Sequence, residues 1–325
     1  MLESIIAILG GFVVLVWGAD RCVLGASATA RNLGVSPLVI GLTIVGIGTS
    51  APELLVSGIA SWQGNPGLAI GNALGSNIAN VALVIGVTAL VVPLVVKSET
   101  LRREFPVLLA IMVLALLLMI DGDLSFFDGV VLLVGLFAMF FWLVRLGLKE
   151  RGQSGADPMT SEYEDEIPSH MPMAKAVMWL VIGLVCLLAA SRVLVWGAVN
   201  IALEFGISDL VIGLTIVAVG TSLPELSASV MSALKNEHDI AVGNVLGSNM
   251  INLLGVLAMP GILAPGVFAE EVLTRDLPVM IGLMVAFFLM AYGFRGHGRI
   301  NRLEGAILLS AFIGYMTVIY FSSVS

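Results

Sequence analysis

Two glutamates, Glu53 and Glu225, each lie in an otherwise apolar stretch of the chain, directly after a Gly-Thr-Ser-X-Pro sequence. The segments that contain them, 41–80 and 213–252, align without a gap at a constant offset of 172 residues. A carboxylate at membrane depth is energetically costly, so by default it marks a path for an ion or a substrate. Two related copies of such a segment predict one site that is built between the two halves of a transporter.

The residues before each glutamate predict a kinked or broken helix. A proline inside a helix lacks its N–H and clashes with the carbonyl four residues earlier. Pro52 therefore frees the carbonyl of Gly48, and Pro224 frees that of Gly220. Glycine at these two positions lets the backbone bend at low steric cost. Free carbonyl oxygens at membrane depth are tolerated only where they line a cavity or bind something, so both breaks are expected at a site.

A polar stripe follows each glutamate along the chain. Asn72, Ser76 and Asn80 are four residues apart, so they share one face of a predicted helix. The second copy repeats this spacing with Asn244, Ser248 and Asn252. Amides and hydroxyls inside lipid need polar partners, so these side chains are candidates for ligands or for contacts between helices.

Four neighbouring amides have simpler interpretations. Asn77 and Asn249 lie one residue off the polar faces, where packing between helices is as good an interpretation as ligand binding. Asn72 and Asn244 come near the predicted helix starts, where an asparagine side chain commonly caps the helix. We therefore leave these four residues out of the predicted ligand set.

The polar groups of the two copies supply only oxygen ligands, namely carboxylates, hydroxyls, amides and freed backbone carbonyls. Hard cations such as Ca²⁺ and Na⁺ prefer oxygen, and Ca²⁺ takes about 6–8 such ligands. The sequence has no set of cysteines and histidines for zinc or copper. Two carboxylates carry two negative charges, which one Ca²⁺, two Na⁺ or two H⁺ would neutralise equally. This equality is a physical basis for competition and exchange at one site.

Composition predicts an all-α membrane protein. The chain is 58% hydrophobic and 12% charged, with a mean hydropathy of +1.05, whereas a soluble domain is typically about 25% charged. Apolar runs of about 20 residues, the length of a spanning helix, are frequent. The ten predicted spans are 5–25, 36–60, 68–95, 105–120, 127–147, 174–200, 209–234, 240–265, 276–294 and 303–322. The lipid bilayer is therefore an expected partner, and nucleic acid is not.

A polar and acidic loop, 148–173, divides five predicted spans from five. The flanking halves, 1–147 and 174–325, each contain one copy of the repeated segment. Because five is odd, the two halves must enter the membrane with opposite orientations, an architecture known among transporters. The odd-numbered loops carry 13 of the 15 lysines and arginines, so they are predicted to be cytoplasmic. Both termini are then outside, and the acidic linker is inside.

The chain resembles the sodium/calcium exchanger superfamily of cation/Ca²⁺ antiporters, and it is similar to the bacterial inner-membrane members. Gly-Thr-Ser-X-Pro-Glu followed by Gly-Asn-X-X-Gly-Ser-Asn-X-X-Asn, present twice, carries the resemblance, which covers essentially the whole chain. It implies ten transmembrane helices as two inverted five-helix repeats, located in the inner membrane. It also implies export of Ca²⁺ in exchange for Na⁺ or H⁺ by alternating access, in which the first and sixth spans slide against the rest.

The resemblance also implies the ligands of the transported cation. The metal-binding carboxylates are Glu53 and Glu225, and the family's other ligand positions match Thr49, Ser50, Thr221, Ser222, Ser76, Asn80, Ser248 and Asn252. Some sodium/calcium exchangers carry an aspartate where this chain has Asn80 or Asn252. The missing charge is expected to affect the Na⁺ stoichiometry, the use of H⁺ as the coupling ion, or the affinity for Ca²⁺.

Other functions compete with Ca²⁺ export. The same oxygens would serve an antiporter for another cation, or an oxygen-lined cation channel. A membrane enzyme that uses the two glutamates as a carboxylate pair is a third class, but no catalytic motif supports it. The nucleotide-binding sequence Gly-X-X-X-X-Gly-Lys-Ser/Thr does not occur, so coupling to ATP within this chain is not expected. We expect no cofactor, and only the transported Ca²⁺ and Na⁺ or H⁺ as ligands.

Overall fold

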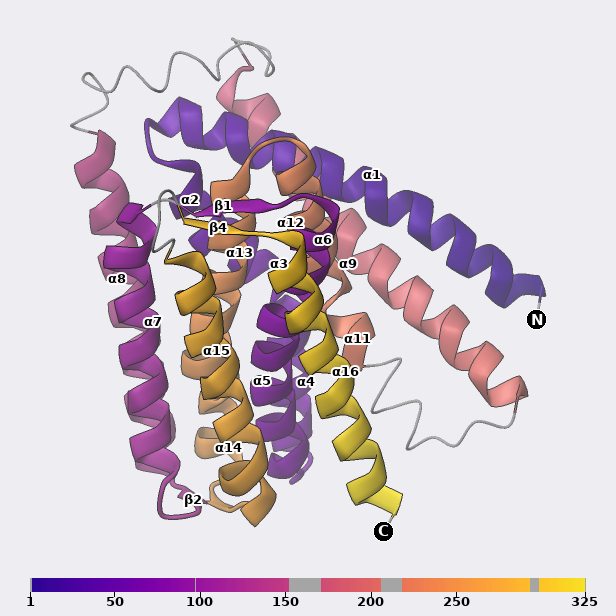
Figure 1. The fold of residues 1–325 in the computed structure, drawn as a ribbon, viewed down its shortest axis with the longest axis vertical. Helices are drawn as coiled ribbons and strands as arrows, with labels where there is room; N and C mark the ends of the chain where they lie inside the picture. Colours follow the sequence, from indigo (N-terminus) through magenta and orange to yellow (C-terminus); the bar gives the residue numbers. More distant parts are fainter. Residues whose placement is uncertain (1, 97, 152–170, 206–217, 293–297, 325) are drawn as a thin grey trace.

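Most of the described residues are helical (Figure 1). The computed structural model describes residues 2–96, 98–151, 171–205, 218–292 and 298–324. Within these residues, seven helices are long and apolar enough to cross a membrane. The number is eight if 37–49 and 51–62, which meet at a bend of 44°, form one span. The chain is therefore a helical membrane protein, as the composition predicts.

The described residues of the first half form eight α-helices, two π-helical segments and two short strands. In chain order they are α1 (Leu2–Leu33), α2 (Pro37–Ile40), η1 (Gly41–Val45), α3 (Gly46–Thr49), α4 (Ala51–Trp62), α5 (Pro66–Ala79), η2 (Asn80–Ile85), α6 (Gly86–Val91), β1 (Leu94–Val96), α7 (Ser98–Met119), β2 (Asp123–Leu124) and α8 (Phe126–Arg151).

The described part of the second half follows a similar order. Its elements are α9 (Met173–Glu204), α11 (Ala218–Thr221), α12 (Leu223–Leu234), α13 (His238–Ile251), η5 (Asn252–Val256), α14 (Ala258–Leu263), β3 (Gly266–Val267), η6 (Val272–Asp276), α15 (Leu277–Ala291), β4 (Gly298–Ile300) and α16 (Arg302–Val324).

Eight of the ten predicted spans coincide with these apolar helices. The predicted span 105–120 falls on α7, and the span 209–234 is described only from residue 218 onward, as α11 and α12. The first and sixth spans are longer than expected, because α1 and α9 each contain 32 residues. The count of ten spans stays a prediction.

Helices α1 and α9 lie side by side and run obliquely to the other helices (Figure 1). Their axes approach closely at glycines. A Cβ atom on Gly25 would clash with the backbone of Leu180, and one on Gly183 would clash with that of Cys22. Small residues that let two backbones meet are typical of helix contacts in lipid, where packing rather than the hydrophobic effect holds helices together.

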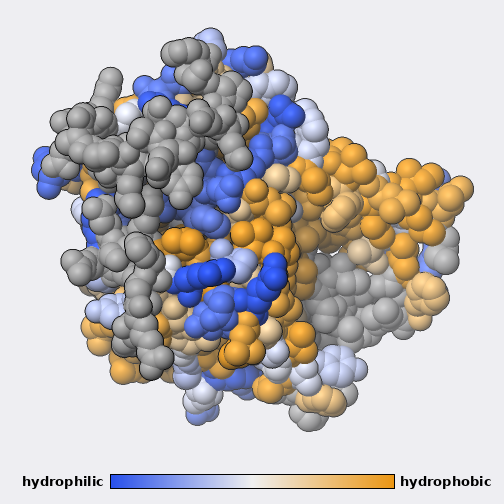
Figure 2. Space-filling view, turned by 45° about the horizontal axis from the view of Figure 1, so that its top comes forward, coloured by the Kyte–Doolittle hydropathy of each residue, from blue (hydrophilic) through white to orange (hydrophobic). Residues whose placement is uncertain are grey.

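Two helical segments form the interior of the molecule. All of the most apolar window of 238–263 is buried, as is most of that of 66–91, whereas only 17% of the corresponding window of α16 is buried. Figure 2 shows a hydrophobic surface over the projecting part of the molecule where α1 and α9 lie. A large apolar surface of this kind fits contact with lipid chains.

Two short antiparallel ribbons join the halves at opposite ends of the helices (Figure 1). In the first ribbon, β1 pairs with β4, and Leu94 lies opposite Ile300. In the second, β2 pairs with β3, and Leu124 lies opposite Gly266. Each ribbon thus links a strand from the first half of the chain to a strand from the second half.

Candidate cation-binding site

Both predicted helix breaks are present. Helix α3 ends at Thr49 and α4 begins at Ala51, with Ser50 between them at φ −82° and ψ 6°. In the second half, Ser222 separates α11 from α12 at φ −87° and ψ 2°. Proline follows each break within the first two positions of the new helix, where its missing N–H costs nothing.

The breaks place both glutamates in the first turn of a helix. Glu53 lies in α4 and Glu225 in α12, and each is only 1% exposed. The N-terminal turn of a helix presents unpaired N–H groups and a partial positive charge, which stabilise a carboxylate nearby. Such stabilisation is partial, and a buried carboxylate still needs a counter-charge.

The helices that carry the two glutamates each contact the other half of the chain. Helix α4, which carries Glu53, contacts η5, and α12, which carries Glu225, contacts η2. The Ser50 hydroxyl donates to the Glu225 carboxylate, with Oγ and Oε1 3.3 Å apart. The side chains of Thr49 and Ser248 approach within 3.5 Å. Residues from the two repeated segments therefore form one polar centre rather than two.

Two of the π-helical segments begin at the last residue of a polar stripe. Segment η2 starts at Asn80 and η5 starts at Asn252, which are equivalent positions in the two copies. Single-turn π segments inside α-helices are frequent at functional sites. Both asparagines are buried, as are Ser76 and Ser248 one turn earlier. Of the predicted ligand positions, Thr221 alone is half-buried rather than buried.

Several buried oxygen atoms at this centre have no hydrogen-bond partner among the described residues. They are Glu53 Oε2, Glu225 Oε2, Ser222 Oγ, Asn80 Oδ1 and Asn252 Oδ1. A buried polar atom without a partner costs about 1–3 kcal/mol, so such atoms are rare in folded proteins. Their chemistry, two carboxylates among neutral oxygens, matches the ligands that Ca²⁺ and Na⁺ prefer.

Asn80 and Asn249 meet across the two halves. The Asn80 amide donates from Nδ2 to Oδ1 of Asn249, 3.0 Å away. Asn249 thus takes part in the polar centre although it lies off the predicted face. The bond also uses the Asn80 nitrogen, which leaves its Oδ1 as the atom available for a cation.

Asn72 and Asn244 do not cap helices, so that interpretation is wrong. Helix α5 begins at Pro66 with Asn65 as its cap, and α13 begins at His238. The Asn72 amide instead donates to the carbonyl oxygen of Glu53 at 3.0 Å. In the same way, the Asn244 amide donates to the carbonyl oxygen of Glu225 at 3.2 Å.

The same two amides also donate hydrogen bonds to two serines that sequence reasoning did not single out. Asn72 Nδ2 lies 3.1 Å from the hydroxyl of Ser57, and Asn244 Nδ2 lies 3.0 Å from that of Ser229. Both serines are fully buried. They occupy equivalent places in the repeat, four residues after each glutamate. This recurrence is the feature of the sequence that could have identified them.

The carbonyl that Pro224 frees is bound by the protein itself. Ser191 of α9 donates from Oγ to the carbonyl oxygen of Gly220 at 2.7 Å. At the other break, an added Cβ on Gly48 would lie 2.8 Å from the side chain of Leu184, also on α9. One helix, α9, therefore contacts both breaks, two helical turns apart.

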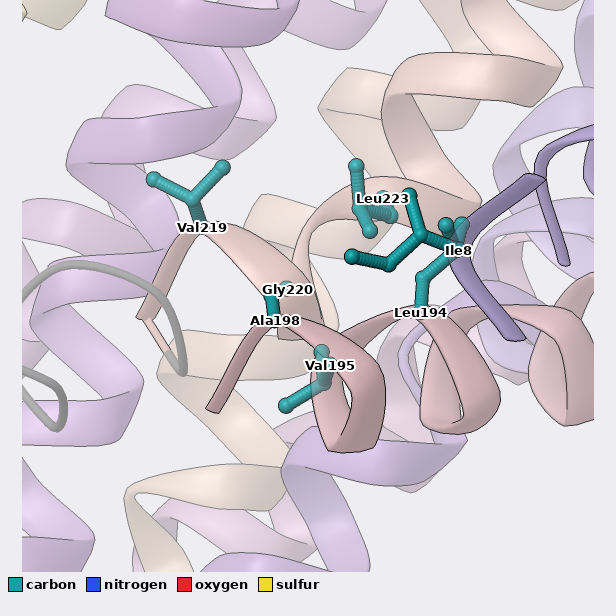
Figure 3. Close-up of a pocket in the computed structure, with 7 residues that line it drawn as sticks. All are labelled: Ile8, Leu194, Val195, Ala198, Val219, Gly220 and Leu223. Carbon is teal, nitrogen blue, oxygen red and sulfur yellow. The ribbon is translucent and has the colours of Figure 1, made fainter. Parts of the chain in front are cut away.

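An apolar cavity of about 420 Å³ lies beside this centre, between α1, α9, α11 and α12 (Figure 3). Its lining includes Leu194 and Val195 of α9 and Leu223 of α12. Among the described residues that line it, none has a polar side chain, in contrast to the polar centre.

The family's sequence model, described as sodium/calcium exchanger protein, matches residues 3–145 and 175–321. The chain belongs to this family. It is 50% identical to the putative antiporter CaxA of Alkalimonas amylolytica, over 99% of this chain and 100% of that protein. It is 39% identical to the inner membrane protein YrbG of Escherichia coli, over 99% of this chain and 98% of that protein.

A solved structure extends the similarity to the fold. The sodium-calcium exchanger NCX_Mj, soaked with 2.5 mM Na⁺ and 0.1 mM Ca²⁺, matches with a TM-score of 0.79 and 35% identity. The match covers 97% of each chain. Family membership and this fold identify the protein as a membrane antiporter of the exchanger type, with relatives in the bacterial inner membrane.

Proposed function

We propose that this chain exports Ca²⁺ in exchange for Na⁺ or H⁺, by alternating access at one site between its two halves. The observation that carries the proposal is the pair Glu53 and Glu225. Each is buried, comes from one copy of the same motif, and has a carboxylate oxygen without a partner among the described residues. Two such charges attract a divalent cation or two monovalent ones, and the low polarity around them disfavours leaving them uncompensated.

The proposed ligand set extends from the two glutamates to neutral oxygens. It contains the hydroxyls of Thr49, Ser50, Thr221, Ser222, Ser76 and Ser248, and the amides of Asn80 and Asn252. Contacts of α4 with η5 and of α12 with η2 support a single site that draws on both copies. Neutral oxygens complete the coordination of a hard cation without adding charge.

Residues 1–147 and 174–325 are proposed to be inverted repeats of five spans each. The equivalent breaks at Ser50 and Ser222, with nearly equal backbone angles, support this assignment. So do the π segments that begin at Asn80 and Asn252. With positively charged loops inside, both termini are outside and the linker 148–173 is cytoplasmic.

Alternating access requires part of the protein to move past the site. Helices α1 and α9 pack on each other through glycines, and α9 reaches both helix breaks. We propose that these two helices move together, as the resemblance implies. The apolar cavity between α9 and α11 supports this motion, because it leaves space beside one break (Figure 3).

The charge of the site favours electroneutral exchange. Glu53 and Glu225 supply two negative charges, and the polar stripes end in the neutral Asn80 and Asn252. One Ca²⁺ moving outward for two Na⁺ or two H⁺ moving inward keeps the site neutral in both states. Neutrality lowers the cost of carrying the loaded site across the membrane interior.

The decisive experiment is uptake of radioactive Ca²⁺ into everted membrane vesicles. One set of vesicles is loaded with Na⁺ and diluted into Na⁺-free buffer, and another carries an acid interior with no Na⁺ gradient. Uptake driven by one gradient, and absent in Glu53→Gln, supports the proposal and names the coupling ion. Flux without any counter-ion would support a channel instead. No Ca²⁺ uptake under either gradient would overturn Ca²⁺ as the substrate and direct the assay to K⁺, Mg²⁺ or Mn²⁺.

A further inference from the structure

We propose that Asn244 is a positioning residue that orients the Thr49 hydroxyl toward the transported cation and ties the two halves of the site together. The proposal rests on the proposed function of this site. Asn244 lies inside α13 and is 0% exposed. It belongs to neither the glutamate pair nor the predicted ligands, yet it contacts Thr49, directly before the first break, and Glu225, in the first turn after the second.

The first step of the argument concerns the orientation of the Asn244 amide. Its Nδ2 lies 3.2 Å from the carbonyl oxygen of Glu225 and 3.0 Å from the hydroxyl of Ser229. A backbone carbonyl can only accept a hydrogen bond, so the nitrogen and not the oxygen must face Glu225. The surroundings of the side chain therefore fix which of its ends points in each direction.

The second step concerns Thr49, which lies in the other half of the chain. With the nitrogen fixed, Asn244 Oδ1 faces the Thr49 hydroxyl, 3.0 Å from Oγ1. Thr49 Oγ1 also lies 3.0 Å from the carbonyl oxygen of Val45. Neither of these oxygens carries a hydrogen, so both can only accept from Thr49, whose hydroxyl also lies near the Glu225 carboxylate and 3.5 Å from Ser248 Oγ. The single hydroxyl hydrogen serves one acceptor at a time, and the oxygens of Asn244 and Val45, both at 3.0 Å, are closer than that of Ser248. The lone pairs of Thr49 are then left for a cation.

The third step is the comparison with the equivalent residue, Asn72. It makes the same two bonds within its own half, to the carbonyl oxygen of Glu53 and to the hydroxyl of Ser57. The bond from an amide to a glutamate carbonyl is thus a feature of both repeats. The bond from Thr49 to Asn244 adds a link between residues 195 positions apart.

Asn244 therefore acts through other residues rather than on the cation itself. Both of its amide hydrogens have acceptors, and its oxygen accepts from Thr49. Its loss would release the first turn of α12, which carries Glu225, and would remove one of the two nearest acceptors of the Thr49 hydroxyl, so that its hydrogen turns toward the carbonyl of Val45. Both changes weaken the binding of the cation without removing a ligand atom.

A double-mutant cycle tests whether Asn244 acts through Thr49. The full-length protein, Asn244→Ala, Thr49→Val and the double variant are purified and reconstituted into liposomes. The half-saturating Ca²⁺ concentration is measured twice, from Ca²⁺-dependent thermal stabilisation and from exchange. We expect Asn244→Ala to raise it roughly tenfold in the unmodified background but only about threefold beside Thr49→Val, where only its contacts with Glu225 and Ser229 remain to be lost.

Asn72→Ala is the matched control. It removes the equivalent amide and its bonds to Glu53 and Ser57, so its effect should be equal with and without Thr49→Val. Equal effects of Asn244→Ala in both backgrounds, or none in either, would overturn the proposal, since a purely structural role gives additive losses. If Asn244→Ala does not accumulate, Asn244→Ser replaces it, because a serine side chain is too short to bridge Glu225 and Thr49.

The same experiment separates this proposal from the proposed function. An unmodified protein that neither binds nor exchanges Ca²⁺ overturns Ca²⁺ export, and the cycle is then run with the cation that does stabilise the protein. An unmodified protein that binds no cation overturns both. If the unmodified protein binds Ca²⁺ and the losses caused by Asn244→Ala and Thr49→Val are additive, only the proposed role of Asn244 is overturned.

Discussion

The hydroxyl of Ser50 donates to the carboxylate of Glu225, with Oγ and Oε1 3.3 Å apart. Ser50 forms the helix break of the first half, and Glu225 follows the break of the second half. A movement of either broken helix therefore changes the surroundings of the other half's carboxylate. In the proposed function, this bond couples the two halves at the site where the cation would bind.

Replacing either buried carboxylate should abolish transport. Glu53→Gln and Glu225→Gln keep the size of the side chain but remove one of the two charges that hold the cation. Losing one partner of a buried charged contact costs about 2–5 kcal/mol, so we expect the exchange rate at low Ca²⁺ to fall at least about thirtyfold. The measurement is Ca²⁺ exchange in liposomes at matched protein amounts.

The control for both variants is Glu3→Gln, which changes an exposed glutamate in the first turn of α1. It should leave exchange within about twofold, because a solvent- or headgroup-exposed charge contributes little. Normal exchange in Glu53→Gln or Glu225→Gln would show that the pair does not bind the transported ion.

Asn252→Asp should change the coupling of transport to the membrane potential. Both polar atoms of the Asn252 side chain are buried without a hydrogen-bond partner among the described residues. A carboxylate there would raise the charge of the site from two to three, so a neutral exchange of one Ca²⁺ for two Na⁺ would no longer balance it. We expect Na⁺-driven Ca²⁺ uptake to become sensitive to a potassium diffusion potential set with valinomycin.

Asn80→Asp provides the contrast at the equivalent position. Its nitrogen donates to Asn249 Oδ1, so an aspartate there would place two acceptors 3.0 Å apart. We expect this variant to lose more transport activity than Asn252→Asp, because it breaks a bond as well as adding a charge. Unchanged voltage and Na⁺ dependence in Asn252→Asp would mean that this position does not set the coupling.

The repeated motif was enough to predict the pair of broken helices and the two glutamates beside them. A proline after Gly-Thr-Ser has a definite effect on a helix, and a constant offset implies that the effect occurs twice. The polar stripes were predicted as faces, and Ser76, Asn80, Ser248 and Asn252 are buried together with the apolar residues around them. Their roles as ligands follow from the resemblance and stay a prediction.

The contacts of Asn72 and Asn244 could not be predicted in the same way. Spacing along one helix shows which side chains share a face, but not which backbone atoms of the neighbouring helix lie opposite. Ser191 gave no signal at all, because a single serine in an apolar span has no periodicity. The N-terminal part of the predicted seventh span, 209–217, lies outside the described residues.

The proposed topology predicts the location of the C-terminus. A reporter that is active only outside the cytoplasm, fused after Ser325, should be active, whereas one inserted into the linker 148–173 should not. The physical reason is the concentration of lysine and arginine in the odd-numbered loops, which stay on the cytoplasmic side. A cytoplasmic reading at the C-terminus would contradict the arrangement of two inverted five-helix repeats.

Ser191→Ala tests whether α9 moves past the break in the second half. The Ser191 hydroxyl binds the Gly220 carbonyl at 2.7 Å, and this bond must break once per cycle if α9 slides against α11. A hydrogen bond of this kind contributes about 1 kcal/mol, so its removal should raise the maximum exchange rate roughly fivefold when the movement limits the rate. The half-saturating Ca²⁺ concentration should change by less than about twofold.

Ser310→Ala is the matched control, since the Ser310 hydroxyl donates to the carbonyl of Ala306 within the exposed helix α16. It removes a hydroxyl from a helix without removing a contact between helices, so exchange should stay as in the unmodified protein. If Ser191→Ala also left the maximum rate unchanged, the bond would persist through the cycle, and α9 and α11 would have to move as one body. If it instead weakened Ca²⁺ binding at an unchanged maximum rate, Ser191 would act on the geometry of the site rather than on the motion.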